Sequence, residues 1–141
     1  MTELITAALT SAGFSILFGL KRKYILFTSA GGFLCWLIYL AAKSFDFGEF
    51  AASFVSALAV AFFCEVLARL LKAPATVFFT PSIIPLVPGR SLFYAISFAV
   101  SGDSTKAWDF ASQTAAVSAA IAVGLGVVIS VFAAVSKYKR N

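Results

Sequence analysis

Residues 74–91 read PATVFFTPSIIPLVPGRS, and this stretch decides how the fourth apolar segment of the chain is built. Three prolines fall within eight residues, and a glycine follows them: Pro81, Pro85, Pro88 and Gly89. A proline in a helix removes a backbone donor and its ring clashes with the preceding turn. We therefore predict a half-helix that ends near Thr80, an unwound stretch, and a second half-helix that begins near Pro88.

The composition around this stretch is that of a membrane protein. Hydrophobic residues make up 61% of the 141 residues and charged residues only 12%, against about 45–50% and about 25% in soluble domains. The mean hydropathy is +0.97. A soluble domain of this size leaves much of its surface in water, so it has no room to bury that much apolar surface. A soluble enzyme, a nucleic-acid-binding domain and a disordered tail are excluded.

Five apolar runs are long enough to cross a bilayer, which takes about 20 residues. They cover residues 4–20, 24–42, 50–71, 74–100 and 110–135, with a polar loop expected at 101–109. The basic residues nearest the first run follow it, whereas a cleaved signal peptide carries them in front. We predict an all-α integral membrane protein, a single domain of residues 1–141, with five transmembrane helices of which the fourth is broken.

The basic residues are distributed unevenly between the two ends of these runs. One set of ends holds Lys21, Arg22, Lys23, Arg69, Lys72, Lys137, Lys139 and Arg140, and the other holds Lys43 and Lys106. Because loops rich in Lys and Arg stay in the cytoplasm, we predict a multi-pass protein of the cell membrane. Its N-terminus lies outside and its C-terminus in the cytoplasm.

Two charged residues lie within the third run, where a charge is costly unless it is paired or faces a cavity. Glu65 and Arg69 are four residues apart, so they share a face of a helix. One interpretation is an internal salt bridge that lets Arg69 reach the interface. The other is that the pair lines a proton or ion pathway.

The second half-helix of the broken run favours an anion. Its N-terminus carries free amides and the positive end of the helix dipole, and Pro88 suits the first turn because it has no amide to leave unpaired. We predict a substrate site for a carboxylate at Pro85, Pro88, Gly89, Arg90 and Ser91. Broken helices with termini at such a site recur in secondary transporters. The alternative is a kink that serves packing alone.

Small residues at fourfold spacing favour close helix packing. They are Ser11, Ser15 and Gly19 in the first run, and Gly126, Ser130 and Ala134 in the fifth.

Catalytic chemistry finds little support in the sequence. There is no His, and therefore neither the usual general base nor the commonest metal ligand. Cys35 and Cys64 lie in apolar runs and are interpreted as small buried residues. No nucleotide-binding loop is present. We expect no enzyme, no cofactor and no nucleic-acid partner.

The proline-rich stretch resembles that of the threonine/serine exporter family. The similarity rests on KAPAT at 72–76 and PSIIPLVPG at 81–89, and extends to GFSILF at 13–18 and to Gly32 with Trp36. The chain looks like the smaller five-helix half of such exporters, which is fused to a second half or forms a separate subunit. The resemblance implies export of threonine and serine, or of dicarboxylates such as succinate.

Two departures from the family pattern bear on this resemblance. Gly19-Leu20-Lys21 stands where an Asn-x-Pro turn is expected, which puts the geometry of that turn in doubt. Arg90 follows Gly89 where another small residue is expected. A fixed cation there would favour a more acidic solute, or would face the partner.

These observations favour a subunit of a secondary exporter for small carboxylate-bearing solutes. Five spans reverse the direction of the chain, so two such units in tandem would be inverted repeats, and this chain would be one half. Its expected partners are the lipid bilayer, the solute, and a larger five-helix subunit or further copies of itself. The alternative from another class is a scaffold or assembly subunit that transports nothing.

Overall fold

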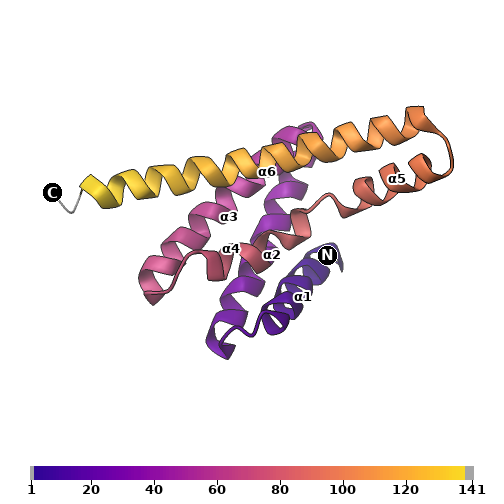
Figure 1. The fold of residues 1–141 in the computed structure, drawn as a ribbon. Coiled ribbons are helices and arrows are strands. Elements are labelled where there is room, and N and C mark those ends of the chain that lie inside the picture. The colour runs from indigo at the N-terminus through magenta and orange to yellow at the C-terminus, as the bar shows by residue number, and fades with distance from the viewer. Residues whose placement is uncertain (1, 139–141) are drawn as a thin grey trace.

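The computed structural model describes residues 2–138, and this part of the chain is helical throughout, with short connections (Figure 1). The helices are α1 (Thr2–Leu17), α2 (Arg22–Ser44), α3 (Glu49–Leu71), α4 (Thr76–Ile83), a 3-10 turn η1 (Ile84–Leu86), α5 (Gly89–Val100) and α6 (Ser104–Tyr138). Lys139 and Arg140, on which the predicted orientation partly rests, lie outside the described residues. The all-α membrane architecture agrees with the sequence.

Three of these helices, α2, α3 and α6, are long and apolar enough to cross a membrane. The segments Thr76–Leu86 and Gly89–Val100 add a fourth if they form one span bent by 56°. α1 has 16 residues, about 24 Å of helix, which is shorter than the hydrocarbon core of about 30 Å. The structure therefore supports three to four candidate spans, and the count of five is not confirmed.

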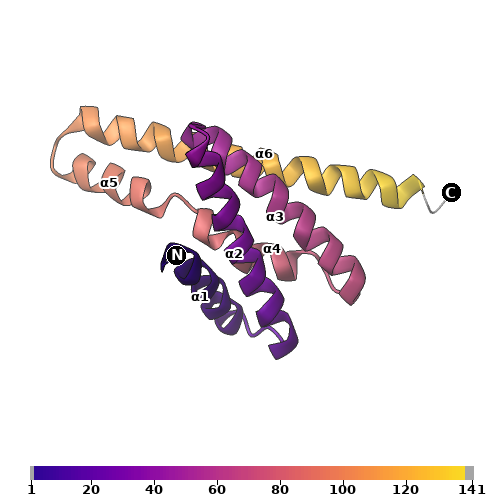
Figure 2. The same ribbon diagram turned by 180° about the vertical axis from the view of Figure 1, so that it is seen from behind.

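α1, α2 and α3 lie side by side and alternate in direction (Figures 1 and 2). At one end of the first pair the Trp36 indole donates to the Glu3 carboxylate at 3.3 Å, and nearer the other end the hydroxyls of Ser15 and Thr28 lie 2.6 Å apart. These two contacts fix α1 and α2 as an antiparallel pair. α3 turns back after a short loop and supplies most of the buried core, including Val60, Cys64 and Leu67.

Two glycines of α2 allow its neighbours to approach closely. A Cβ at Gly32 would lie 2.7 Å from the Cβ of Ser11 in α1, and a Cβ at Gly31 would collide with the hydroxyl of Ser82 in α4. Ser11 and Ser15 are buried, as their spacing predicted, whereas Gly19 lies beyond the end of α1. Small residues here serve close packing, as in many membrane helices.

α6 runs parallel to α3. A Cβ at Gly124 would lie 2.9 Å from the Cβ of Ala57, and further along both helices the rings of Phe62 and Phe132 lie 5.6 Å apart. The predicted contact face at Gly126, Ser130 and Ala134 is wrong, because Gly126 and Ser130 are exposed and Gly124 makes the close approach. Because α3 and α6 run in the same direction, the chain between them must return to the end at which α3 began. The segments α4, η1 and α5 follow this return path.

The break in the fourth apolar segment is shorter than predicted. α4 continues through Pro81 to Ile83, and η1 carries the helical path to Leu86, so only Val87 and Pro88 are non-helical. Packing explains the difference, because Pro81 is fully buried and the Ser82 hydroxyl donates to the Thr28 carbonyl at 3.2 Å. The α4 helix is thereby held through a proline that would end an isolated one.

Val87 is extended, with ψ 129°, as expected for the residue before a proline. α5 then begins at Gly89, close to the predicted restart near Pro88.

α5 and the first part of α6 form a hairpin that projects beyond the other helices (Figures 1 and 2). The predicted loop at 101–109 is mostly wrong, because α6 already begins at Ser104. Gly102, with φ +84°, makes the turn, and the Asp103 carboxylate accepts the Lys106 amide at 3.2 Å and so caps the helix. Hydrogen bonds from the side chain and amide of Lys106 hold the pKa of the Asp103 carboxyl below its usual range.

Candidate functional site

A cavity of about 700 Å³ lies where the α4–α5 break meets the end of α2, the start of α3 and the first part of α6. Volumes of this order are typical of small-molecule sites. All five residues predicted to bind substrate line it: Pro85, Pro88, Gly89, Arg90 and Ser91. The structure therefore brings the predicted site residues together in one place.

The N-terminus of α5 is arranged differently from the prediction in one respect. The Gly89 amide is not free, because it donates to the Val87 carbonyl at 2.7 Å. The Leu92 amide donates to the Pro88 carbonyl at 3.1 Å. Among the described residues, the amides of Arg90 and Ser91 have no acceptor, so these two groups remain for an anion.

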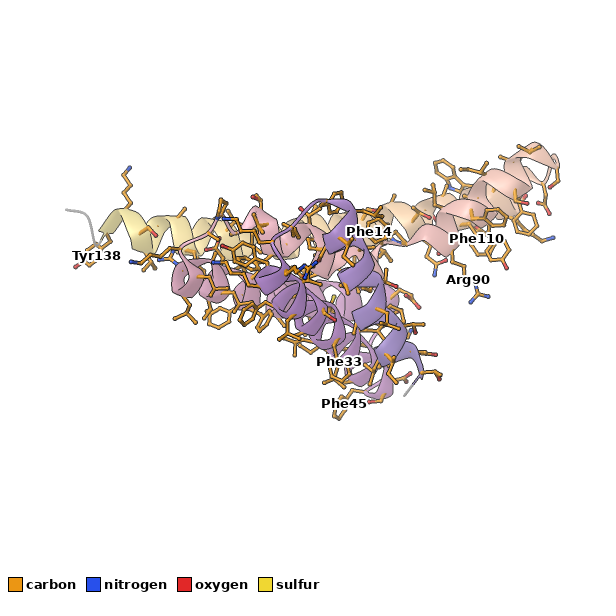
Figure 3. The ribbon with its side chains drawn as sticks, turned by 90° about the horizontal axis from the view of Figure 1, so that it is seen from below. Phe14, Phe33, Phe45, Arg90, Phe110 and Tyr138 are labelled. Carbon is orange, nitrogen blue, oxygen red and sulfur yellow. The ribbon has the colours of Figure 1, made fainter. Side chains whose placement is uncertain are left out.

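Gly89 and Arg90 are both open toward their surroundings. No heavy atom lies within 4 Å of the position that a Cβ at Gly89 would take. Arg90 is exposed and its guanidinium lies 5.7 Å from the centre of the Tyr94 ring. Its side chain extends from the α5–α6 hairpin rather than into the helix packing (Figure 3). The guanidinium thus lies toward Tyr94, one turn along α5 from the two free amides.

The α6 side of the cavity supplies a polar contact that the sequence did not indicate. The Ser91 hydroxyl donates to the Gln113 side-chain carbonyl, with 3.4 Å between the oxygens. Because this contact joins α5 to α6, it holds Ser91 against α6.

The α2 and α3 side of the cavity carries a second polar group of residues. The Glu49 carboxylate accepts hydrogen bonds from the Tyr39 hydroxyl at 2.7 Å and from the Lys43 ammonium at 3.2 Å. Trp36 stacks on Tyr39, with 4.9 Å between the ring centres. The sequence assigned no role in this site to Tyr39 or Glu49. A signal was present, since Lys43 and Glu49 flank a short predicted loop that brings them together.

Glu65 and Arg69 lie outside this cavity. Their side chains approach to 3.9 Å, with Glu65 14% exposed and Arg69 46% exposed. Arg69 also donates to α6, to the Phe132 carbonyl at 3.1 Å and to the Ser136 hydroxyl at 2.8 Å. The pair is thus brought together with the C-terminal part of α6 and not with Gly89.

The residues for metal or redox chemistry are few. Between residues 2 and 138 no group of three or more Cys, Asp or Glu side chains is placed to hold a metal ion. Cys35 and Cys64 are free and buried in the core.

Comparison with known proteins identifies the family of this chain. A curated protein of Mycobacterium tuberculosis, named "Probable threonine/serine exporter", is 32% identical to the chain over 106 residues. The match covers 75% of this chain and 20% of that protein, so the chain spans about a fifth of its relative's length. No solved structure matches. The family profile described as "Threonine/Serine exporter, ThrE" matches residues 3–131, nearly the whole chain. The chain therefore belongs to the threonine/serine exporter family.

Proposed function

We propose that the chain is one part of a secondary exporter for small carboxylate-bearing solutes, namely threonine and serine or dicarboxylates such as succinate. The single observation that carries this proposal is the cavity at the helix break. There Arg90 and the amides of Arg90 and Ser91 offer positive charge and two free donors. A carboxylate is the small-solute group that such a set of donors fits best.

Five crossings are part of this proposal, with α1 as the first and the bent pair as the fourth. Support comes from the alternating directions of α1, α2 and α3 and from the parallel run of α3 and α6, which needs a return crossing between them. With an odd number of crossings, a second unit of the same kind would be inverted relative to this one. We propose that this second half, on a larger subunit or another copy, completes the pathway.

The orientation that goes with this proposal has the N-terminus outside and the C-terminus in the cytoplasm of a cell-membrane protein. Lys43 and Glu49 then lie at the outer end of α2 and α3. Both residues line the cavity, so this part of its wall belongs to the outer side of the protein in this arrangement.

A proton or ion pathway through Glu65 and Arg69 is a weaker part of the proposal. The contacts of Arg69 with Phe132 and Ser136 favour the alternative, a structural link between α3 and α6. If the chain were instead a scaffold or assembly subunit that transports nothing, the cavity would bind no solute.

The test uses cells that express the chain in its native setting and the same cells with its coding region deleted. Both are loaded with labelled threonine, serine and succinate, and the rates of export are compared. We expect deletion to slow export of at least one of these solutes. Restoring the wild-type chain should recover the rate, and Arg90→Ala should recover less of it at equal protein level. Export that is unchanged by deletion would contradict the proposal.

A further inference from the structure

The cavity holds a carboxylate of its own, Glu49, on the side away from the α5 amides. Glu49 is the first residue of α3 and its side chain is 42% exposed. It accepts hydrogen bonds from the Tyr39 hydroxyl and from the Lys43 ammonium, both at the end of α2. All three residues line the same cavity as Arg90 and Ser91. One cavity therefore offers a cationic group from α5 and an anionic group from α3.

The Lys43 ammonium indicates what Glu49 can hold. Its nitrogen lies 3.2 Å from a Glu49 oxygen, which is the geometry of an ammonium paired with a carboxylate. A solute's amino group has the same charge and the same three donors. The Trp36–Tyr39 stack lies beside it in the cavity wall, and aromatic faces attract cations.

We propose that Glu49 binds the positively charged amino group of the solute, displacing Lys43. The cavity then takes a zwitterionic amino acid, with its carboxylate at α5 and its ammonium at Glu49, in preference to a dicarboxylate. This inference rests on the proposed export function and narrows it, because a second carboxylate would meet Glu49 with like charge.

The competing explanation of Glu49 is structural. A carboxylate in the first turn of a helix stabilises the N-terminus through the helix dipole, and an exposed ion pair adds little to stability. If that were its whole role, removing either member of the pair would have similar effects on every solute. The ligand role predicts opposite effects of the two substitutions on threonine, none on a monocarboxylate that lacks an ammonium, and tighter binding of a dicarboxylate when Glu49 is neutralised.

The experiment uses everted membrane vesicles from cells that express the full chain in its native setting. Uptake of labelled threonine, succinate and N-acetylthreonine is measured separately, and each unlabelled solute is also tested as a competitor of threonine. N-acetylthreonine lacks the ammonium. The variants are Glu49→Gln, Glu49→Asp and Lys43→Met. Asp103→Asn is the matched control, since Asp103 forms a similar exposed ion pair with Lys106 at 2.9 Å but does not line the cavity.

We expect Glu49→Gln to weaken threonine binding at least tenfold, to leave N-acetylthreonine within twofold, and to strengthen succinate binding because the like charge is removed. Glu49→Asp should retain part of the preference for threonine, which separates lost charge from lost folding. Lys43→Met should bind threonine at least as tightly as the wild type, because it frees Glu49, and Asp103→Asn should match the wild type.

Three results would overturn the inference but leave the proposed export function intact. They are an equal loss of threonine binding in Glu49→Gln and Lys43→Met, an equal loss of binding for all three solutes in Glu49→Gln, and a wild type that prefers succinate. Wild-type vesicles that take up none of the three solutes faster than vesicles without the chain would overturn the export function as well.

Discussion

Arg69, near the end of α3, donates a hydrogen bond to the Phe132 carbonyl of α6 at 3.1 Å, and its guanidinium lies 4.8 Å from the centre of the Phe132 ring. A third contact joins it to the Ser136 hydroxyl. Because α6 also carries α5, the position of the cavity wall formed by α5 depends on how firmly α3 holds α6. Arg69 is therefore connected to the candidate site through packing and not through direct contact.

Replacing Arg69 with Gln should loosen the pairing of α3 and α6. Interhelical hydrogen bonds in membranes are worth about 1 kcal/mol each, so we expect a lower unfolding temperature and less extracted protein. Glu65→Gln should lower the unfolding temperature less, because Glu65 contacts Arg69 at the long distance of 3.9 Å. Thermal unfolding in detergent, measured beside export, checks this. Unchanged stability in both variants with lost export would instead support the ion pathway.

Gly89→Val should abolish export while the protein stays inserted and bound to its partner. A branched side chain at the start of α5 would stand over the free amides of Arg90 and Ser91. Gly89→Ala should have a milder effect. Since no atom lies within 4 Å of a Cβ at this position, neither variant is expected to lose stability. Export from loaded cells, compared with the yield of extracted complex, provides the measurement, and a normal export rate in Gly89→Val would contradict substrate binding here.

Gly32→Ala should destabilise the α1–α2 pair. The new methyl group would lie 2.7 Å from the Cβ of Ser11 and 3.0 Å from the Ala7 carbonyl oxygen, which cannot move without shifting the α1 backbone. Overpacking of this kind costs about 1–3 kcal/mol. Gly13→Ala is the matched control, because nothing lies within 4 Å of its Cβ position. Unfolding temperatures of the two variants should differ, with Gly32→Ala lower.

Cysteines introduced at Ser104 and Lys137 should react from opposite sides of the membrane, with Ser104 outside. The two residues lie near the two ends of α6. The native Cys35 and Cys64 are fully buried, so an impermeant maleimide should give little background with the unmodified chain. Labelling of both introduced cysteines from the same side would disprove the proposed orientation.

Some of the site could be predicted because its cause is local. Pro88 has no amide, the residue before it is driven to an extended conformation, and Gly89 follows, so the restart of the helix near these residues depends on the chain itself. Pro81 shows the limit of that reasoning. Its effect on the helix is overridden by its complete burial among the packed helices, which no local pattern reveals.

Glu49 could not be assigned a role for a related reason. Its place in the cavity depends on how α5 sits relative to the α2–α3 hairpin, and these segments are about 40 residues apart in sequence. The closeness of Glu49 to Lys43 was within reach of sequence reasoning. That Glu49 and the start of α5 line one cavity was not.

The length of α6 makes the thickness of the bilayer a variable for this protein. Its 35 residues extend over about 52 Å, well beyond the hydrocarbon core, so the helix must tilt or stand out of the lipid. Lipids with longer acyl chains would decrease the tilt of α6 from the bilayer normal, and lipids with shorter chains would increase it. Because α5 belongs to the same hairpin, either change would also move the wall of the cavity. The chain length of the surrounding lipids would therefore change the shape of the candidate site without any change in the sequence.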